Sequence, residues 1–249
     1  MEPQNIDKLR QMRLPGFIAG LEEQAQNSSY SQLSFEERFS FLIDKEYLLR
    51  QNNRLKSRLR AAKLKQSVSV EDIEYSAKRN LNKSAIAEFS SCNWLEKKQN
   101  LIITGPTGVG KSFIACALGN KACFSGYRVL YVRLSDLLLQ VKLAESEGEY
   151  VQFINKLLKF QLLIVDEWLR DPLTADTARK ILDLIDDRYQ NSSTVFCSQL
   201  PVSDWHQCIQ DPTIADAVLD RIVHHSHRIE LSGESMRKKK GQASLRSDN

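Results

Sequence analysis

The residues best suited to chemistry form a glycine-rich loop at 105–112, directly after the apolar run at 101–104. Its glycines allow a tight backbone path that points successive N–H groups at a phosphate, and the helix expected to begin near Lys111 adds the positive end of its dipole. Lys111 is expected to reach the β- and γ-phosphates of ATP, and the Ser112 hydroxyl to ligate Mg²⁺. The predicted nucleotide-binding residues are Gly105, Pro106, Thr107, Gly108, Val109, Gly110, Lys111, Ser112 and Phe113.

Asp166 and Glu167 form the second group, because they end the apolar run at 162–165. At the carboxyl end of a buried strand, Asp166 is expected to hold Mg²⁺ through its water shell, and Glu167 to orient and deprotonate an attacking water. An apolar run ending in Asp-Glu is a weak signal by itself, but here it follows an intact phosphate loop. The sequence therefore predicts ATP hydrolysis, with Ser112 and Asp166 at the Mg²⁺.

Phosphoryl transfer also needs positive charge near the γ-phosphate as it departs, and an arginine commonly supplies that charge. Arg221 and Arg237 are the candidates, although a surface ion pair with Asp216 or Asp220 is an alternative role for Arg221. Gln199 follows the run at 194–198 and could hydrogen-bond the γ-phosphate or the attacking water, on position alone. The predicted catalytic residues are Lys111, Asp166, Glu167, Gln199, Arg221 and Arg237.

Strand and helix signals alternate from residue 100 onward. Apolar runs at 101–104, 128–132, 162–165 and 194–198 predict strands, and segments at 113–118, 137–143, 150–158 and 175–189 predict helices. This alternation is typical of an α/β fold in which a parallel sheet is sandwiched by helices and ligands bind at the carboxyl ends of the strands.

The N-terminal part has the sequence features of a helical region. Ser34 and Glu37 form a capping box that opens a segment without proline or glycine as far as Lys65. Phe35, Phe39 and other apolar residues, including Leu42 and Leu49, recur at helical spacing in its first half and are expected to pack. A further helix start is expected at 69–72. These signals predict a helical domain at 1–68 and a nucleotide-binding domain at 69–249.

The second half of that helix is basic and contains no acidic residue. It is too polar to bury and suits contact with the phosphates of duplex DNA, although a solvated helix face is the alternative. A second basic run lies at 237–240, in the basic C-terminal tail. The predicted DNA-binding residues are Arg50, Arg54, Lys56, Arg58, Arg60, Lys63 and Lys65.

The composition is that of an ordinary globular protein, with 249 residues, 42% hydrophobic content and a net charge of +4. No apolar run approaches the roughly 20 residues that cross a bilayer, so we expect a cytoplasmic protein without a membrane partner. The five cysteines form no C-x-x-C pair and are expected to be reduced and mostly buried. Three nearby histidines lack a metal-ligand spacing, and the three tryptophans are expected to pack rather than to stack on bases.

A resemblance to a known family rests on motifs spread along the chain. They are the phosphate loop at 105–112, Gly126-Tyr127-Arg128 with the strand after it, Ser198-Gln199-Leu200-Pro201, Asp211-Pro212-Thr213, Asp220-Arg221 and Gly233-Glu234-Ser235-Met236-Arg237, together with Leu14-Pro15-Gly16 and the segment at 33–38. In these the sequence resembles the IstB family of ATP-binding transposition helper proteins from bacterial insertion sequences, which are AAA+ ATPases similar to the helicase loader DnaC.

The resemblance implies an AAA+ fold, a homo-oligomer on duplex DNA with ATP sites at subunit interfaces, DNA-stimulated hydrolysis, and delivery of a cognate transposase to target DNA. By position, Gln199 matches sensor 1, Arg221 the arginine finger given to a neighbouring subunit, and Arg237 sensor 2. The chain departs from the family at Glu167-Trp168-Leu169, where members often carry Asp-Trp-Gly, and at Cys197, where threonine is more usual.

Two other functions remain open at this point. A replicative helicase loader would share the ATPase and differ in its partner. A nucleotide-gated DNA-architectural protein would bind ATP but hardly hydrolyse it, and Glu167 argues against that interpretation. A small-molecule kinase is disfavoured because no acceptor pocket is recognisable, whereas a basic helix and a candidate arginine finger are present.

Overall fold

A computed structural model of the chain describes residues 3–76 and 79–236, and the chain forms two compact units, Met1–Ser57 and Arg58–Asn249. The division falls earlier than the boundary expected after residue 68. The reason is that residues 58–68 pack within the second unit. The Arg58 guanidinium donates through Nε to the Cys123 carbonyl at 2.9 Å, and the Asn120 amide donates to the Val68 carbonyl at 2.8 Å.

The N-terminal unit is helical. Its elements are α1 (Pro3–Gln11), α2 (Pro15–Gln26), the 3₁₀ turn η1 (Ser28–Gln32) and the larger part of α3 (Phe35–Ala62). The predicted capping box is present, since the Glu37 carboxylate accepts from the Ser34 N–H at 2.8 Å and the Ser34 hydroxyl accepts from the Glu37 N–H at 3.2 Å. Helix α3 ends before Lys63, whose φ of 50° lies in the left-handed region.

Glu46 on α3 caps the start of α2 and explains why Leu14-Pro15-Gly16 is found there. The Glu46 side chain is 9% exposed, and its Oε2 accepts from the backbone N–H groups of Gly16 at 2.7 Å and Phe17 at 3.2 Å. A methyl group on Gly16 would lie 2.7 Å from the Glu46 Cα, so only glycine allows this approach. Arg50 Nε donates to Glu46 Oε1 at 2.6 Å, which fixes one of the predicted DNA contacts inside the unit.

The first half of α3 packs less than the sequence predicts. Leu42 is buried, as expected, but Phe35 is 71% exposed and Phe39 is 44% exposed. Their rings stack on each other, with centroids 5.7 Å apart. Two apolar side chains four residues apart can therefore pack against each other on a helix surface without being buried in a core.

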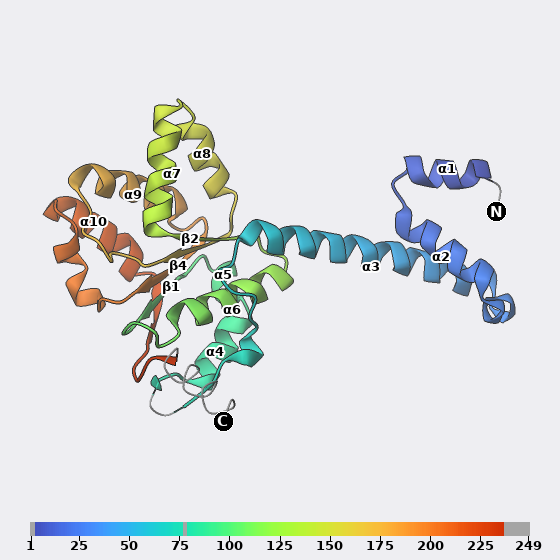
Figure 1. The fold of residues 1–249 in the computed structure, drawn as a ribbon, viewed down its shortest axis with the longest axis horizontal. Helices are drawn as coiled ribbons and strands as arrows, with labels where there is room; N and C mark the ends of the chain where they lie inside the picture. Colours follow the sequence, from blue (N-terminus) through green and yellow to red (C-terminus); the bar gives the residue numbers. More distant parts are fainter. Residues whose placement is uncertain (1–2, 77–78, 237–249) are drawn as a thin grey trace, which may run out of the picture. The chain divides into compact units, whose positions relative to one another are not determined.

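The second unit is built on a parallel sheet with strand order β2-β3-β4-β1-β5 (Figure 1). The four predicted strands are present as β1 (Asn100–Thr104), β2 (Val129–Arg133), β3 (Leu162–Asp166) and β4 (Ser193–Ser198). The edge strand β5 (Ser226–Glu230) was not predicted, because it is mostly polar. It forms by pairing with β1, in the register Leu101 with His227 and Ile103 with Ile229.

Helices cover both faces of the sheet, as predicted (Figure 1). One face packs against α7 (Leu134–Ser146), α8 (Tyr150–Leu158), α9 (Ala175–Arg188) and α10 (Pro212–Val223). The other face packs against α6 (Lys111–Phe124), which contacts α4 (Lys83–Ser90). The helix expected to start at residue 69 is only the 3₁₀ turn η2 (Val70–Asp72). Other short elements among the described residues are α5 (Asn93–Glu96), η4 (Val202–Asp204) and η5 (His206–Cys208).

The core confirms the interpretation of the tryptophans as packing residues. Trp168 is 1% exposed and Trp205 is fully buried, and both rings contact Phe196. All five cysteines are free thiols, and four of them are buried. Among the described helices, none is both long enough and apolar enough to cross a bilayer.

Candidate active site

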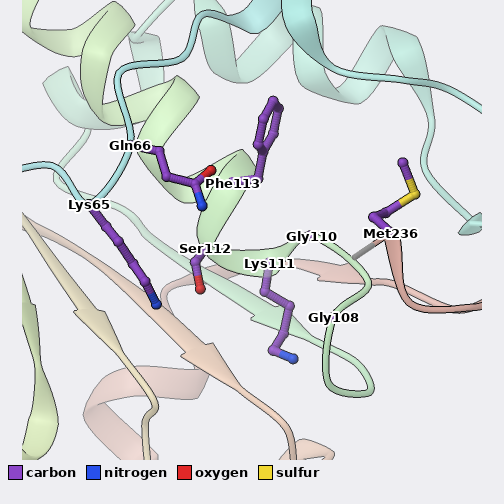
Figure 2. A pocket seen from close by; sticks show the side chains of 8 residues that line it. All are labelled: Lys65, Gln66, Gly108, Gly110, Lys111, Ser112, Phe113 and Met236. Carbon is purple, nitrogen blue, oxygen red and sulfur yellow. The ribbon is translucent and has the colours of Figure 1, made fainter. Parts of the chain in front are cut away.

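The phosphate loop joins β1 to α6 at the carboxyl edge of the sheet. Gly110 is the N-cap of α6 with φ 104°, a conformation that glycine adopts without steric cost. A methyl group at Gly110 would also lie 2.7 Å from an Arg79 guanidinium nitrogen. The Met236 N–H donates to the Gly108 carbonyl at 2.9 Å, so the segment after β5 lies against the loop (Figure 2). A methyl group at Gly108 would lie 2.8 Å from the Ser235 Cβ, so this segment leaves no room for a larger residue at Gly108.

Lys111 and Ser112 begin α6 with their functional atoms turned toward the loop and the sheet edge. Lys111 Nζ donates to the carbonyls of Gly105 at 2.7 Å and Pro106 at 2.8 Å. Ser112 Oγ donates to Asp166 Oδ2 at 2.7 Å. The structure therefore joins the loop and the end of β3 through one hydroxyl and one carboxylate. These are the hard oxygen donors that suit Mg²⁺.

Asp166 is almost fully buried, and its two oxygens have separate partners. The Glu167 N–H donates to Oδ1 at 2.9 Å, and the hydroxyl of Tyr131 on β2 donates to Oδ2 together with Ser112. Burial is the larger cause and this hydrogen bond the next, and both raise the pKa of Tyr131 well above its ordinary value. The phenol therefore stays protonated as a donor. Tyr131 was missed from sequence, because its period-2 position in β2 indicates only a buried face.

Glu167 is held by two arginines that the sequence did not single out. Arg170 Nη1 lies 2.5 Å from Glu167 Oε2, and Arg133 Nε lies 3.7 Å from Oε1. The register of β2 against β3 sets Arg133 opposite Asp166, which brings it to this edge. Alignment of the two strands was the only signal that could have found Arg133.

Gln199 follows β4 and reaches the phosphate loop. Its Oε1 accepts a hydrogen bond from Thr107 Oγ1 at 2.6 Å. The structure thus brings Gln199 to the same edge as Lys111, Asp166 and Glu167, as sequence position predicted.

Arg221 lies elsewhere. It forms an ion pair with Asp186 on α9, and neither Asp216 nor Asp220, the alternatives considered from sequence, is its partner. The cavity beside Arg221 is also lined by Asn100 and Thr194, which lie at the amino ends of β1 and β4. Arg221 is therefore at the edge of the sheet opposite its own phosphate loop. Arg237 lies outside the described residues, as does the basic run at 237–240.

Arg79 is a buried residue of the loop region that sequence reasoning missed. Its Nη2 donates to the Val109 carbonyl at 2.8 Å, while Nε is buried with no hydrogen-bond partner among the described residues. Burial lowers the pKa of Arg79, although Glu74 and Tyr75 act in the opposite direction. Through its hydrogen bond to the Val109 carbonyl, the guanidinium holds the backbone of the phosphate loop.

The predicted DNA-binding residues separate into two groups. Arg50 and Arg58 donate to partners within their own units, and Lys65 Nζ lies 3.9 Å from Asp166 Oδ2. The others are exposed, and within the described residues their side chains make no ion pair or hydrogen bond. These are Arg54, Lys56, Arg60 and Lys63.

Lys65 and Gln66 line the same pocket as the phosphate loop (Figure 2). The other residues of its wall are Gly108, Gly110, Lys111, Ser112, Phe113 and Met236.

The family model and the similar proteins found by comparison point to the same family. The family model described as IstB-like ATP binding protein matches residues 7–244. A putative insertion sequence ATP-binding protein, y4pL of Sinorhizobium fredii, is 42% identical over 94% of this chain and 95% of its own length. The putative ATP-binding protein of insertion sequence IS1162 from Pseudomonas fluorescens is 39% identical over 82% of this chain and 88% of its own.

Solved structures are similar in fold. DnaI matches with a TM-score of 0.58 at 17% identity, covering 71% of this chain and 94% of that one. The DnaC helicase loader matches with 0.54 at 18%, covering 71% and 99%. AMPPCP-bound DnaA from Aquifex aeolicus matches with 0.59 at 18%, covering 74% of this chain but about half, 56%, of that one. The chain therefore has the P-loop α/β fold of AAA+ proteins, with a helical N-terminal region.

Proposed function

This chain belongs to the IstB-like ATP-binding protein family, and from that premise we propose that it is a DNA-stimulated ATPase that oligomerises on duplex DNA and assists a transposase. The observation that carries the proposal is the convergence of Lys111, Ser112, Asp166, Glu167 and Gln199 at one edge of the sheet. Its expected compartment is the cytoplasm, where ATP and DNA are available.

The residues divide the work of hydrolysis between them. The loop N–H groups and Lys111 bind the phosphates, and Lys111 exchanges its loop carbonyl partners for phosphate oxygens. Ser112 and Asp166 would hold Mg²⁺, which supplies charge neutralisation when bound. Glu167 accepts the proton of the attacking water, and Gln199 orients that water or the γ-phosphate. Tyr131 keeps the Asp166 carboxylate in place.

We infer an oligomer from the position of Arg221, the candidate arginine finger. Arg221 lies near the amino ends of β1 and β4, away from its own phosphate loop. A second copy that presents Arg221 to the site would complete it in trans. The Asp186 ion pair, with Arg221 32% exposed, is accessible enough to be exchanged for phosphate. Arg237 is proposed as sensor 2 on sequence position alone.

The DNA and transposase partners rest on the names of the relatives and on the basic helix. Relatives that are 39–42% identical are described as insertion sequence ATP-binding proteins, whereas the helicase loader is similar in fold at 18% identity. This difference favours transposition over helicase loading. Exposed Arg54 and Lys56, with Arg60 and Lys63, supply cations for phosphate contacts.

The proposal is tested by separating nucleotide binding from turnover. We expect Lys111→Ala to abolish tight ATP binding, because it removes the phosphate cation. We expect Glu167→Gln to bind ATP normally and to lose hydrolysis. A fluorescent ATP analogue measures the first and phosphate release on duplex DNA the second. Unchanged turnover in Glu167→Gln would contradict the assignment of the base.

A further inference from the structure

Lys65 was expected to contact DNA, but it lies in the nucleotide pocket. It follows the end of α3 by three residues, and the left-handed Lys63 turns the chain there. The next residues lie along α6. A methyl group on Gly119 of that helix would be 3.1 Å from Leu64 Cδ2, and the backbone of Lys65 and Gln66 lies against the Cys116 thiol.

This path directs the Lys65 ammonium to the residues that would hold Mg²⁺. Its Nζ lies 3.9 Å from Asp166 Oδ2, the oxygen that also accepts from Ser112. In Figure 2 the Ser112 hydroxyl lies between the side chains of Lys65 and Lys111. The Lys65 side chain is 27% exposed and that of Asp166 is 3% exposed, so the ammonium is the partner that can move out to solvent.

We propose that Lys65 is a resident cation of the metal site. Its ammonium neutralises Asp166 until Mg²⁺ binds, and Mg²⁺ then displaces the ammonium. The reason is electrostatic, because a nearly buried carboxylate needs a positive partner, and a divalent ion at that oxygen repels an ammonium close by. In metal-free nucleotide binding, Lys65 remains in the pocket as a second cation for the phosphates. The inference rests on the proposed ATP site and adds a residue to it.

The consequence is a link between metal binding and the segment after α3. Lys65 is attached to a chain that Leu64 and the Val68 carbonyl fasten to α6. Departure of its side chain from Asp166 therefore changes the contacts of the segment that joins the basic helix to the ATPase.

The test compares Lys65→Met with Lys65→Arg and with Lys63→Met, an exposed neighbour of the same charge. Equilibrium binding of ATP is measured in EDTA and again in saturating Mg²⁺, and duplex DNA binding is measured at several salt concentrations. For Lys65→Met we expect about a tenfold loss of ATP affinity in EDTA, as for a charged hydrogen bond. In Mg²⁺ we expect unchanged or tighter binding and a lower half-saturating Mg²⁺ concentration.

Lys65→Arg should keep most of the metal-free affinity. Lys63→Met should leave ATP binding unchanged and lower the log–log salt slope for DNA by about 0.9, a change that Lys65→Met should not produce. Equal losses with and without Mg²⁺ would mean that Lys65 only supports the fold of the pocket. Unchanged ATP binding in Lys65→Met, together with a reduced salt slope for DNA, would mean that Lys65 contacts DNA. Either result overturns the inference.

The proposed function fails separately. A wild-type chain that binds no ATP in either condition overturns the ATP site itself. A wild-type chain that binds ATP and loses that binding in Lys111→Ala retains the ATP site, whatever Lys65→Met does.

Discussion

Replacing Arg170 by alanine should raise the basal rate of ATP hydrolysis. Arg170 occupies one carboxylate oxygen of Glu167, at 2.5 Å, and Arg133 lies near the other. A carboxylate engaged in this way is less available to accept a proton from water. Arg170 also donates to Asp171, at 2.8 Å. This second contact holds the guanidinium beside Glu167, and the guanidinium must move away before both oxygens of Glu167 can accept a proton.

The size of the effect follows from exposure. Arg170 is 47% exposed and Glu167 is 24% exposed, so water and salt screen this ion pair and its contribution is small. Arg133 remains in Arg170→Ala, so one interaction with Glu167 persists. We therefore expect an increase of about two- to fivefold in the rate without DNA.

Steady-state phosphate release at saturating ATP measures this, with and without duplex DNA. Arg179→Ala, at an exposed arginine on α9, is the matched control and should leave the rate unchanged. The increase should vanish when Glu167→Gln is added, because the released base is then absent. A lower rate in Arg170→Ala would refute the reasoning, since it would mean that Arg170 supports the base instead of restraining it.

Three further predictions concern other parts of the chain. Mixing Arg221→Ala with Glu167→Gln subunits should restore activity, because a finger in trans contributes a rate factor of about 10³ to 10⁵; no recovery at any ratio, despite co-assembly, would exclude the trans role. Changing the four exposed cations Arg54, Lys56, Arg60 and Lys63 together to glutamine should lower the log–log salt slope of duplex binding by about 0.9 for each DNA phosphate that is no longer neutralised; a wild-type slope would mean that DNA is held elsewhere. Glu46→Gln should destabilise the N-terminal unit by about 1–3 kcal/mol and speed hydrogen exchange at Gly16 and Phe17. Burial acts to raise the pKa of Glu46, but the hydrogen bonds from Arg50, Phe17 and Gly16 outweigh it and lower the pKa below the ordinary 4.5. The stabilisation by the Glu46 carboxylate is therefore present above pH 4.5 and is lost as pH falls through the folded-state pKa. Exchange at Gly16 and Phe17 that does not depend on pH between about 3 and 6, after correction for intrinsic rates, would contradict this.

The sequence predicted the sheet wherever a strand is buried on both faces. β1 and β3 contain the apolar runs 101–103 and 162–165, and every residue of both strands is buried; such runs have few alternatives to a central strand. The phosphate loop was equally accessible, because its glycines and lysine carry their chemistry in local sequence. Gln199 could be placed because it follows β4, in which every residue is also buried.

What could not be predicted depends on interactions between distant segments. β5 contains Ser226, His227 and Arg228, and nothing in these residues favours a strand until β1 offers its edge. In the same way, seven cations in one stretch look alike by type. Only the turn at Lys63 and the packing of Leu64 on α6 separate Lys65 from the others.

The backbone around Glu167 is where the core and the site depend on each other. Glu167 and Leu169 have φ of 58° and 52°, and such left-handed conformations cost roughly 1–2 kcal/mol for residues other than glycine. Glycine would adopt this conformation at Leu169 without that cost. In return, the Leu169 side chain is buried, at 1% exposed, next to the equally buried Trp168.

Trp168 holds this strained turn to the next strand. Its backbone N–H donates to the Cys197 carbonyl at 2.8 Å, and its backbone carbonyl accepts from Ser198 Oγ at 2.8 Å. Ser198 directly precedes Gln199, so the turn that carries Glu167 and the strand end that carries Gln199 are fixed to each other through one tryptophan. Because the Trp168 ring is packed against Phe196 and Trp205, the relative position of the proposed base and of Gln199 is set by the hydrophobic core and not by the surface loops around them.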